Sequence, residues 1–298
     1  MRVGGRTPSS PEREEETHMT ETSPTIRLVL SDMDGTILDS DHTISPTTGA
    51  AVQRLAERGV ALALVSARMP AAVLPYVRQL GLKGPCVGFN GGVFFTPDGN
   101  ILKSHHFPVE SLMAIMEALS SFPVEIWFQT EQEWLVRECR TPLVLREREL
   151  TGMTPREVES LPMTPETVNR LIVCSDDTAL IARLEEELAP PFAGRASMLR
   201  SAPHKLNITP AKATKGEAVV ELARLYGVTP QEIAALGDAP NDIPMLQAAG
   251  MSIAMGQAQD SVKEQASYVT GKPDEGGWAY AAETFIMPAA PFSDGSRK

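Results

Sequence analysis

Cysteine is scarce in this 298-residue sequence, and long hydrophobic runs are missing. The three cysteines, Cys86, Cys139 and Cys174, lie far apart, are odd in number and form no Cys-x-x-Cys pair. This spacing argues against a disulfide framework and against a zinc site. No apolar run reaches the roughly 18 residues that a membrane-spanning helix needs. We therefore expect a protein of the reducing cytoplasm that has no membrane partner.

Positive charge is also in short supply, because 27 Lys and Arg stand against 38 Asp and Glu, for a formal net charge of -11. Such a balance argues against a nucleic-acid backbone or an anionic membrane as the main partner. It does not exclude a small anionic ligand, which needs only a local positive site. The length predicts about two domains, and the apolar fraction of 42% is ordinary for a globular enzyme.

The two ends of the chain differ from the rest in composition. Residues 1–24 are polar, rich in Pro, Ser and charge, and contain no apolar segment of the kind found in a signal peptide. We predict a disordered tail over 1–24 and a short tail over 291–298. Met19 is an alternative start of translation, and the sequence leaves that choice open.

Apolar strands alternate with helical patterns on both sides of a different middle segment. The runs "IRLVL", "VALALV" and "EIAALG" read as strands that are covered on both faces, with amphipathic helices between them. This order predicts an α/β fold whose core is a doubly wound, Rossmann-like parallel sheet. We assign 25–107 and 202–290 to this core, with "KLNIT" at 205–209 as the strand that resumes it.

The middle segment, 108–201, carries amphipathic strands that read as locally paired. It predicts an inserted α+β cap, an antiparallel sheet with helices on one face. Trp127, Phe128 and Trp134 either line the underside of this cap or pack inside it, and packing is the interpretation we favour.

Acidic residues follow two of the apolar strands of the core. Asp32 and Asp34 come directly after "VLS", and Asp238 comes directly after "AALG". In open parallel sheets, ligands bind beyond the carboxyl ends of the strands. In an extended segment Asp32 and Asp34 point the same way, so two carboxylates crowd one pocket. Such crowding requires a bound cation, for which Mg²⁺ is well suited, or a proton on one of the carboxylates.

A simple turn would also use Asp and Gly, so this motif alone does not decide the matter. Two further residues strengthen the functional interpretation. Ser66 follows another apolar strand, and Lys215 begins a helix that Thr214 caps in the pattern of a capping box. A hydroxyl, a cation and several acids are therefore expected at the same edge of the sheet.

Four segments together resemble the haloacid dehalogenase (HAD) superfamily, and most closely its Cof-type, class IIB phosphatases. They are "DMDGT" (32–36), "SAR" (66–68), "TKGEAV" (214–219) and "GDAPND" (237–242), with the cap between the second and the third. The resemblance implies a Mg²⁺-dependent phosphatase acting through an aspartyl-phosphate. Its substrates would be small phosphorylated metabolites such as sugar, nucleotide, flavin or pyridoxal phosphates.

The resemblance also implies roles for individual residues. Asp32 would be the nucleophile and Asp34 the general acid and base. Asp32, Asp238 and the backbone carbonyl of Asp34 would hold Mg²⁺, and Asp242 would steer a neighbouring group. Phosphate-binding groups would surround the transferring phosphoryl group, namely the backbone N–H groups of Met33 and Ala67 and the side chains of Ser66, Lys215 and Asn241.

Several alternatives stay open at this point. Asn90 is a candidate substrate contact, while Arg68 either contacts substrate or pairs with an acid. Ser66-Ala67 and Gln257 replace the family's usual Thr-Gly and Asn. The same core also supports a phosphotransferase or mutase, or a non-catalytic sensor phosphorylated on Asp32. Neither the substrate nor the choice between monomer and homodimer follows from the sequence, because substrate specificity resides in the cap.

Overall fold

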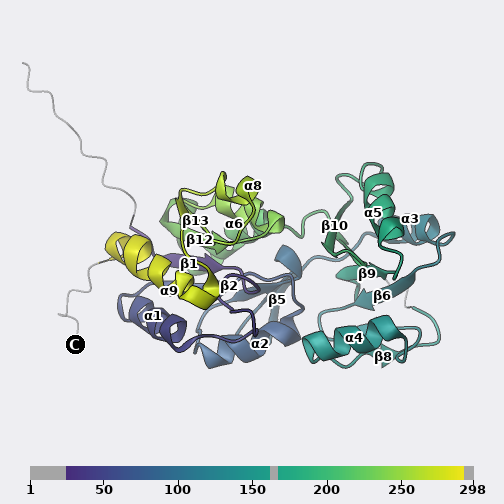
Figure 1. Ribbon diagram of the computed structural model, residues 1–298, viewed down its shortest axis with the longest axis horizontal. Coiled ribbons are helices and arrows are strands. Elements are labelled where there is room, and N and C mark those ends of the chain that lie inside the picture. The colour runs from purple at the N-terminus through teal and green to yellow at the C-terminus, as the bar shows by residue number, and fades with distance from the viewer. Residues whose placement is uncertain (1–24, 162–166, 292–298) are drawn as a thin grey trace, which may run out of the picture.

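The computed structural model describes residues 25–161 and 167–291, arranged as two parts along the long axis of the molecule (Figure 1). The tail predicted for 1–24, and all but the first residue of the tail predicted for 291–298, lie outside the described residues. Both described ends of the chain belong to the larger part, and the middle of the chain forms the smaller one (Figure 1). No helix in the described part of the chain is long and apolar enough to cross a bilayer.

A five-stranded parallel sheet forms the centre of the larger part, in the order β14-β13-β12-β1-β2. The strand bounds are β1 Leu28–Ser31, β2 Ala61–Leu64, β12 Ile233–Gly237, β13 Met251–Ala254 and β14 Tyr268–Val269. β1 is entirely buried and pairs with β2 on one side and with β12 on the other. This arrangement confirms the predicted α/β core and places the carboxyl ends of three strands side by side.

Helices cover both faces of this sheet, with α1 and α9 on one side and α6 and α8 on the other (Figure 1). The helix bounds are α1 Pro46–Glu57, α2 Pro70–Gln79, α6 Lys215–Tyr226, α7 Ile243–Ala248, α8 Asp260–Lys263 and α9 Gly277–Ala281. The predicted N-caps of α1 and α6 are both present. The Thr214 hydroxyl accepts a hydrogen bond from the Glu217 backbone N–H at 3.2 Å, which fixes the turn that begins with Lys215.

A small antiparallel sheet connects this core to the second part. It contains β3 Cys86–Gly88, β4 Val93–Phe95 and β5 Ile101–Ser104, and the β4–β5 hairpin turns over the Pro97–Asn100 segment as the sequence indicated. A single parallel bridge between Val65 and Val87 links it to the end of β2. The chain then leaves the core after β5.

The second part is a six-stranded sheet in the order β10-β11-β9-β6-β7-β8, antiparallel except for the β7–β8 pair. Its strands are β6 Glu125–Gln129, β7 Trp134–Val136, β8 Arg156–Glu157, β9 Arg170–Cys174, β10 Ala196–Ala202 and β11 Lys205–Pro210. The predicted inserted α+β cap is therefore present.

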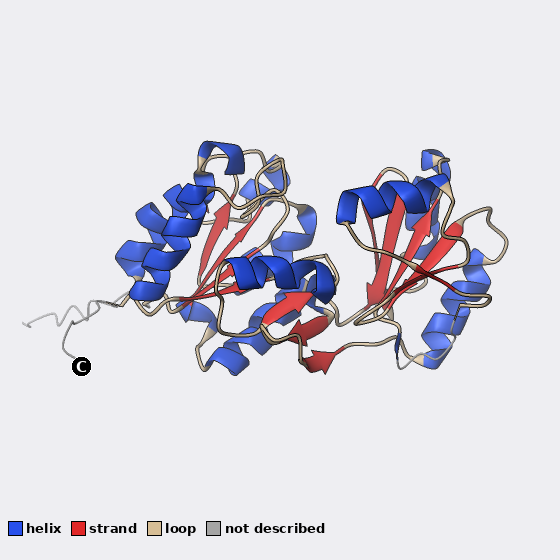
Figure 2. Ribbon diagram, turned by 90° about the horizontal axis from the view of Figure 1, so that it is seen from below, coloured by secondary structure: helices blue, strands red, loops and turns tan. Residues whose placement is uncertain are grey.

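Helices lie on both faces of the cap sheet, so the expectation of helices on one face only is wrong (Figure 2). Helices α3 Val109–Leu119 and α5 Thr178–Leu188 pack against one face together with Phe128. Helix α4 Pro142–Thr151 packs against the other face together with Trp127 and Trp134. Neighbouring residues of a strand point to opposite faces, and both faces of β6 carry aromatic side chains that need covering.

The return from the cap to the core also differs from the prediction. β11 was expected to resume the core, but it pairs with β9 and β10 inside the cap sheet. The cap sheet therefore extends to Pro210, and the chain re-enters the core over 211–214. A buried strand reads the same in sequence whichever sheet it joins, so its local pattern does not locate this boundary.

Candidate active site

The acid at the carboxyl end of β1 is Asp32, which is 6% exposed. The ammonium group of Lys215, from the first turn of α6, contacts Asp32 Oδ1 and lies 2.5 Å from Asp242 Oδ1. Burial raises the pKa of Asp32, the Lys215 ammonium opposes this shift, and the Asp242 carboxylate adds to it. Burial acts to lower the pKa of Lys215, but Asp242 and Asp32 outweigh it and hold that pKa above its usual range.

Three carboxylates converge at this point, because oxygens of Asp32, Asp238 and Asp242 lie within 4.8 Å of one another. Both oxygens of Asp242 are engaged, Oδ1 by Lys215 and Oδ2 by the backbone N–H groups of Asp238 and Ala239 at 2.9 Å each. Asp242 therefore orients Lys215 and the turn after β12. Asp32 and Asp238 are left as the carboxylates best placed to share a cation.

Asp238 contacts only neutral side-chain donors among the described residues, the Thr36 hydroxyl at 3.3 Å and the Gln257 amide at 3.1 Å. Burial raises the pKa of Asp238, and the Asp242 carboxylate raises it further. Crowded, partly buried carboxylate oxygens with a single ammonium between them suit a hard divalent cation, so these residues fit Mg²⁺. Gln257, one of the departures from the family pattern, thus supports this acid directly.

The turn after β1 depends on Gly35, whose φ of +76° lies in the left-handed region. A Cβ on this residue would lie 2.4 Å from Asp238 Oδ2, so the backbone and the acid pack directly against each other. The turn begins at Met33, whose carbonyl accepts hydrogen bonds from the backbone N–H groups of Thr36 at 3.2 Å and Leu38 at 2.9 Å, so the chain is not extended beyond Asp32.

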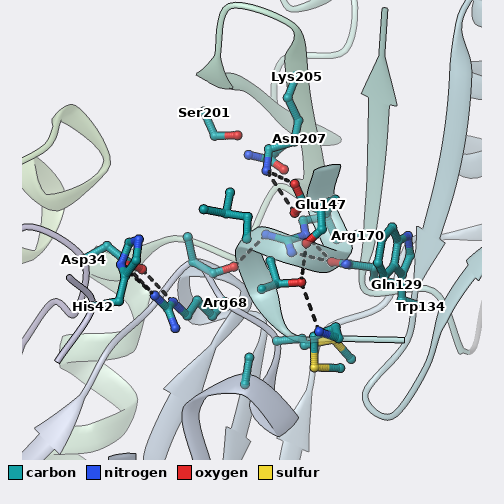
Figure 3. A pocket seen from close by; sticks show the side chains of 16 residues that line it. Asp34, His42, Arg68, Gln129, Trp134, Glu147, Arg170, Ser201, Lys205 and Asn207 are labelled. Carbon is teal, nitrogen blue, oxygen red and sulfur yellow. Dashed lines mark hydrogen bonds and ion pairs between the residues drawn. The ribbon is translucent and has the colours of Figure 1, made fainter. Parts of the chain in front are cut away.

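The sequence led us to expect that Asp34 crowds Asp32. It does not do so. Its carboxylate is held by two nitrogens of the Arg68 guanidinium, with Nε 2.8 Å from Oδ2, and lies 3.1 Å from His42 Nδ1 (Figure 3). Burial acts to raise the pKa of Asp34, but Arg68 and then His42 outweigh it, so the pKa lies below its usual range. The sequence left a bound cation or a proton on one of the two carboxylates as alternatives, and the contacts of Asp34 with Arg68 and His42 favour its ionised form.

Most of the other predicted residues gather around Asp32. A cleft between core and cap is lined by six of them, Asp32, Asp34, Ala67, Asn90, Lys215 and Asn241. The side-chain amide of Asn241 donates to Asn90 Oδ1 at 3.0 Å. Met33 and Ser66 are buried beside this cleft and do not line it, and the Ser66 hydroxyl accepts from the Arg68 backbone N–H at 3.1 Å.

A second cavity begins at Asp34 and runs beneath the cap (Figure 3). The cap contributes eight polar or aromatic side chains to it: Gln129, Trp134, Glu147, Thr151, Arg170, Ser201, Lys205 and Asn207. The guanidinium of Arg170 donates across the domain boundary to the backbone carbonyl of Ala67 at 2.6 Å. Sequence reasoning missed this group, apart from Trp134, because its members are far apart in the chain and share no motif. It also missed His42.

Comparisons with known proteins agree with this arrangement. The chain is 30% identical over 258 residues to a putative phosphatase of Haemophilus influenzae, covering 86% of this chain and 97% of that protein. It is 27% identical to a pyridoxal phosphate phosphatase of Escherichia coli, covering 83% and 94%, and 28% identical to an HMP-PP phosphatase of Serratia proteamaculans, covering 80% and 86%.

A solved haloacid dehalogenase-like hydrolase from Bacteroides thetaiotaomicron superposes with a TM-score of 0.76 at 28% identity, covering 87% of this chain and 98% of that one. A sugar phosphatase of HAD subclass IIB shares the fold, with a TM-score of 0.75 at 24% identity and coverage of 87% and 98%. The family model for haloacid dehalogenase-like hydrolases matches residues 29–281. The chain therefore belongs to the haloacid dehalogenase-like hydrolases, as its four motifs indicated.

Proposed function

We propose that this protein is a cytoplasmic, Mg²⁺-dependent phosphatase that hydrolyses small phosphorylated metabolites through an aspartyl-phosphate on Asp32. The observation that carries the proposal is the buried Asp32 carboxylate at the end of β1, in contact with the Lys215 ammonium and beside Asp238. The names of the relatives support hydrolysis of a phosphate ester. We further propose that 25–107 and 211–290 form the catalytic unit of a monomer or homodimer.

In the first half of the reaction, a carboxylate oxygen of Asp32 attacks phosphorus and forms a P–O bond. The bond from phosphorus to the leaving oxygen breaks, and that oxygen takes a proton from Asp34. The phosphoryl oxygens would be held by Lys215, Asn241 and the backbone N–H groups of Met33 and Ala67. These contacts would position the phosphoryl group and stabilise its charge.

In the second half, water attacks phosphorus, gives its proton to Asp34, and the bond to Asp32 breaks to release inorganic phosphate. An ionised Asp34, as the Arg68 contact favours, is the form that this step needs. The first half needs Asp34 to carry a proton. The proposal therefore requires the Asp34 carboxylate to leave Arg68 once substrate is bound.

Mg²⁺ bound by Asp32, Asp238 and the backbone carbonyl of Asp34 would neutralise charge on the phosphoryl group. The chain's own part is to hold these oxygens in place. Gly35 and Asp242 do so, the first by leaving room for Asp238 and the second by fixing Lys215.

The test is hydrolysis of 4-nitrophenyl phosphate in the presence of Mg²⁺ by Asp32→Asn, with Asp98→Asn as a matched control on the exposed β4–β5 turn. Loss of the nucleophile should lower kcat by roughly 10³-fold or more, while the control stays at the parental rate. Rapid quench with ³²P-labelled substrate should trap label on the parent and none on Asp32→Asn. A loss below about tenfold, or about 1.4 kcal/mol in the barrier, would contradict the assignment.

A further inference from the structure

The cavity under the cap is the place where the leaving group of the proposed reaction must lie. Asp34, Ala67, Ser201 and Asn207 line both this cavity and the cleft above Asp32. Because Asp34 protonates the leaving oxygen in the proposed mechanism, the remainder of the leaving group extends from Asp34 into the cavity. Its volume of about 240 Å³ is below the roughly 300–1,000 Å³ of pockets for drug-sized ligands, so the leaving group is compact.

One face of the cap sheet supplies the polar wall of this cavity. Lys205 and Asn207 alternate on β11 and therefore share a face. Asn207 pairs with Ile172, two residues after Arg170 on β9, and Arg170 pairs with Gln129 on β6. The strand register thus places these four polar side chains on the same face of the sheet.

Most polar groups of the cavity already bind one another. The Lys205 ammonium lies 2.9 Å from a Glu147 oxygen, Arg170 donates to Gln129 and to the Ala67 carbonyl, and Arg68 holds Asp34. Four further lining side chains are apolar: Met69, Ala72, Leu150 and Met153. A sugar presents hydroxyl groups around its whole ring, and this cavity has few free partners for them.

Three lining side chains have no hydrogen-bond partner among the described residues: Ser201, Trp134 and Asn207. Of these, Asn207 carries a donor group and an acceptor group side by side in one plane. Asn207 is 8% exposed, and its Oδ1 atom is buried without a hydrogen-bond donor among the described residues. The side-chain amide group of Asn207 likewise donates to no other residue in the described part of the chain. A planar carboxamide with a free donor and a free acceptor matches the edge of a nitrogen heterocycle that bears an amino group beside a ring nitrogen.

We infer that Asn207 selects the substrate, by two hydrogen bonds to the donor–acceptor edge of a compact nitrogen-heteroaromatic leaving group. This inference rests on the proposed phosphatase function and adds to it the class of substrate. The apolar side chains of the cavity then contact the faces of the ring. The phosphate lies in the cleft above Asp32.

The test compares two substrates of equal ring size, (4-amino-2-methylpyrimidin-5-yl)methyl phosphate and benzyl phosphate, with glucose 6-phosphate as the sugar. The parent should prefer the aminopyrimidine to benzyl phosphate by about tenfold or more in kcat/KM, because only the former offers the polar edge. Asn207→Leu and Asn207→Asp should each bring this ratio close to one. Asn100→Leu, on the exposed hairpin, should leave it unchanged.

The outcomes separate the two claims. A parent that hydrolyses benzyl phosphate as well as the aminopyrimidine, or that prefers glucose 6-phosphate, overturns the inference and leaves the phosphatase function standing. The inference is also overturned if both Asn207 variants keep the parental ratio of kcat/KM between the aminopyrimidine and benzyl phosphate. A parent that hydrolyses none of the three, nor 4-nitrophenyl phosphate, overturns the proposed function and the inference with it. Either Asn207 variant alone suffices if the other does not fold.

Discussion

Replacing Lys215 with Met removes the ammonium that contacts two buried carboxylates while keeping a side chain of similar length. Lys215 is 1% exposed and Asp242 is completely buried, so water does not replace the lost contact. Removing one partner of a buried ion pair typically costs about 3–5 kcal/mol, and we expect a loss of stability in this range at pH 7.

The loss of folding stability is limited at low pH, because a buried carboxylate without a counter-charge takes up a proton there. The folded-state pKa of Asp32 is already raised above its unfolded value of 3.8, and the substitution raises it further. The folded variant then binds more protons than the unfolded chain, so its stability falls as pH rises from about 4 through the raised pKa. The parent loses stability over the same range, but this loss ends at a lower pH because its Asp32 pKa is lower than that of the variant. The deficit against the parent should therefore be larger at pH 8 than at pH 6.

Urea unfolding at both pH values, followed by circular dichroism, measures this difference. Lys103→Met is the matched control, because Lys103 also contacts a carboxylate, Glu221 at 2.8 Å, but is 42% exposed. Exposed pairs contribute about 0–1 kcal/mol. A Lys215→Met deficit no larger than that of Lys103→Met, or one that shrinks from pH 6 to pH 8, would refute the argument.

Metal binding, the cap and the cysteines offer three more tests. Mg²⁺ at a hundredfold excess over its Kd should stabilise the fold by about 2.7 kcal/mol against EDTA in thermal unfolding, and Asp238→Asn should lose most of this gain. A protein with 108–210 replaced by a Gly/Ser link should hydrolyse 4-nitrophenyl phosphate weakly and lose its ranking of metabolites; an unchanged ranking would place specificity in the core. Burial raises the pKa of all three thiols, that of Cys86 to about 12, but Cys86 and Cys174 are buried while Cys139 is half-buried. Cys139 should therefore react first with a thiol reagent at pH 8, and three equally fast thiols would contradict this.

The positions of Asp32, Lys215 and Asp242 could be predicted because each follows a strong local signal. Asp32 ends a wholly buried strand, and Lys215 comes directly after the N-cap Thr214. Parallel pairing then brings strand ends together without further information. Sequence patterns are reliable where a residue's place depends on its own strand or helix.

Asp34 and β11 show where such patterns fail. The direction of Asp34 depends on the turn that begins at Met33 and on a guanidinium 34 residues away. The sheet that β11 joins is decided by β9 and β10. Helix α4 was missed because its sequence is highly charged, although Glu147 is buried against Lys205, 58 residues away. Contacts between distant segments decided all three cases.

The Arg170 guanidinium, which joins the cap to the Ala67 carbonyl, is buried, and no carboxylate forms an ion pair with it in the described part of the chain. Its other close contacts are the Gln129 amide oxygen and the face of the Phe89 ring. Burial lowers the pKa of Arg170 to about 10, which reflects the hydration that the charge has given up. Separation of the two domains would return water to this charge. The contact between cap and core thus places a cation where separation of the domains would break its hydrogen bond to Ala67 and restore part of its hydration.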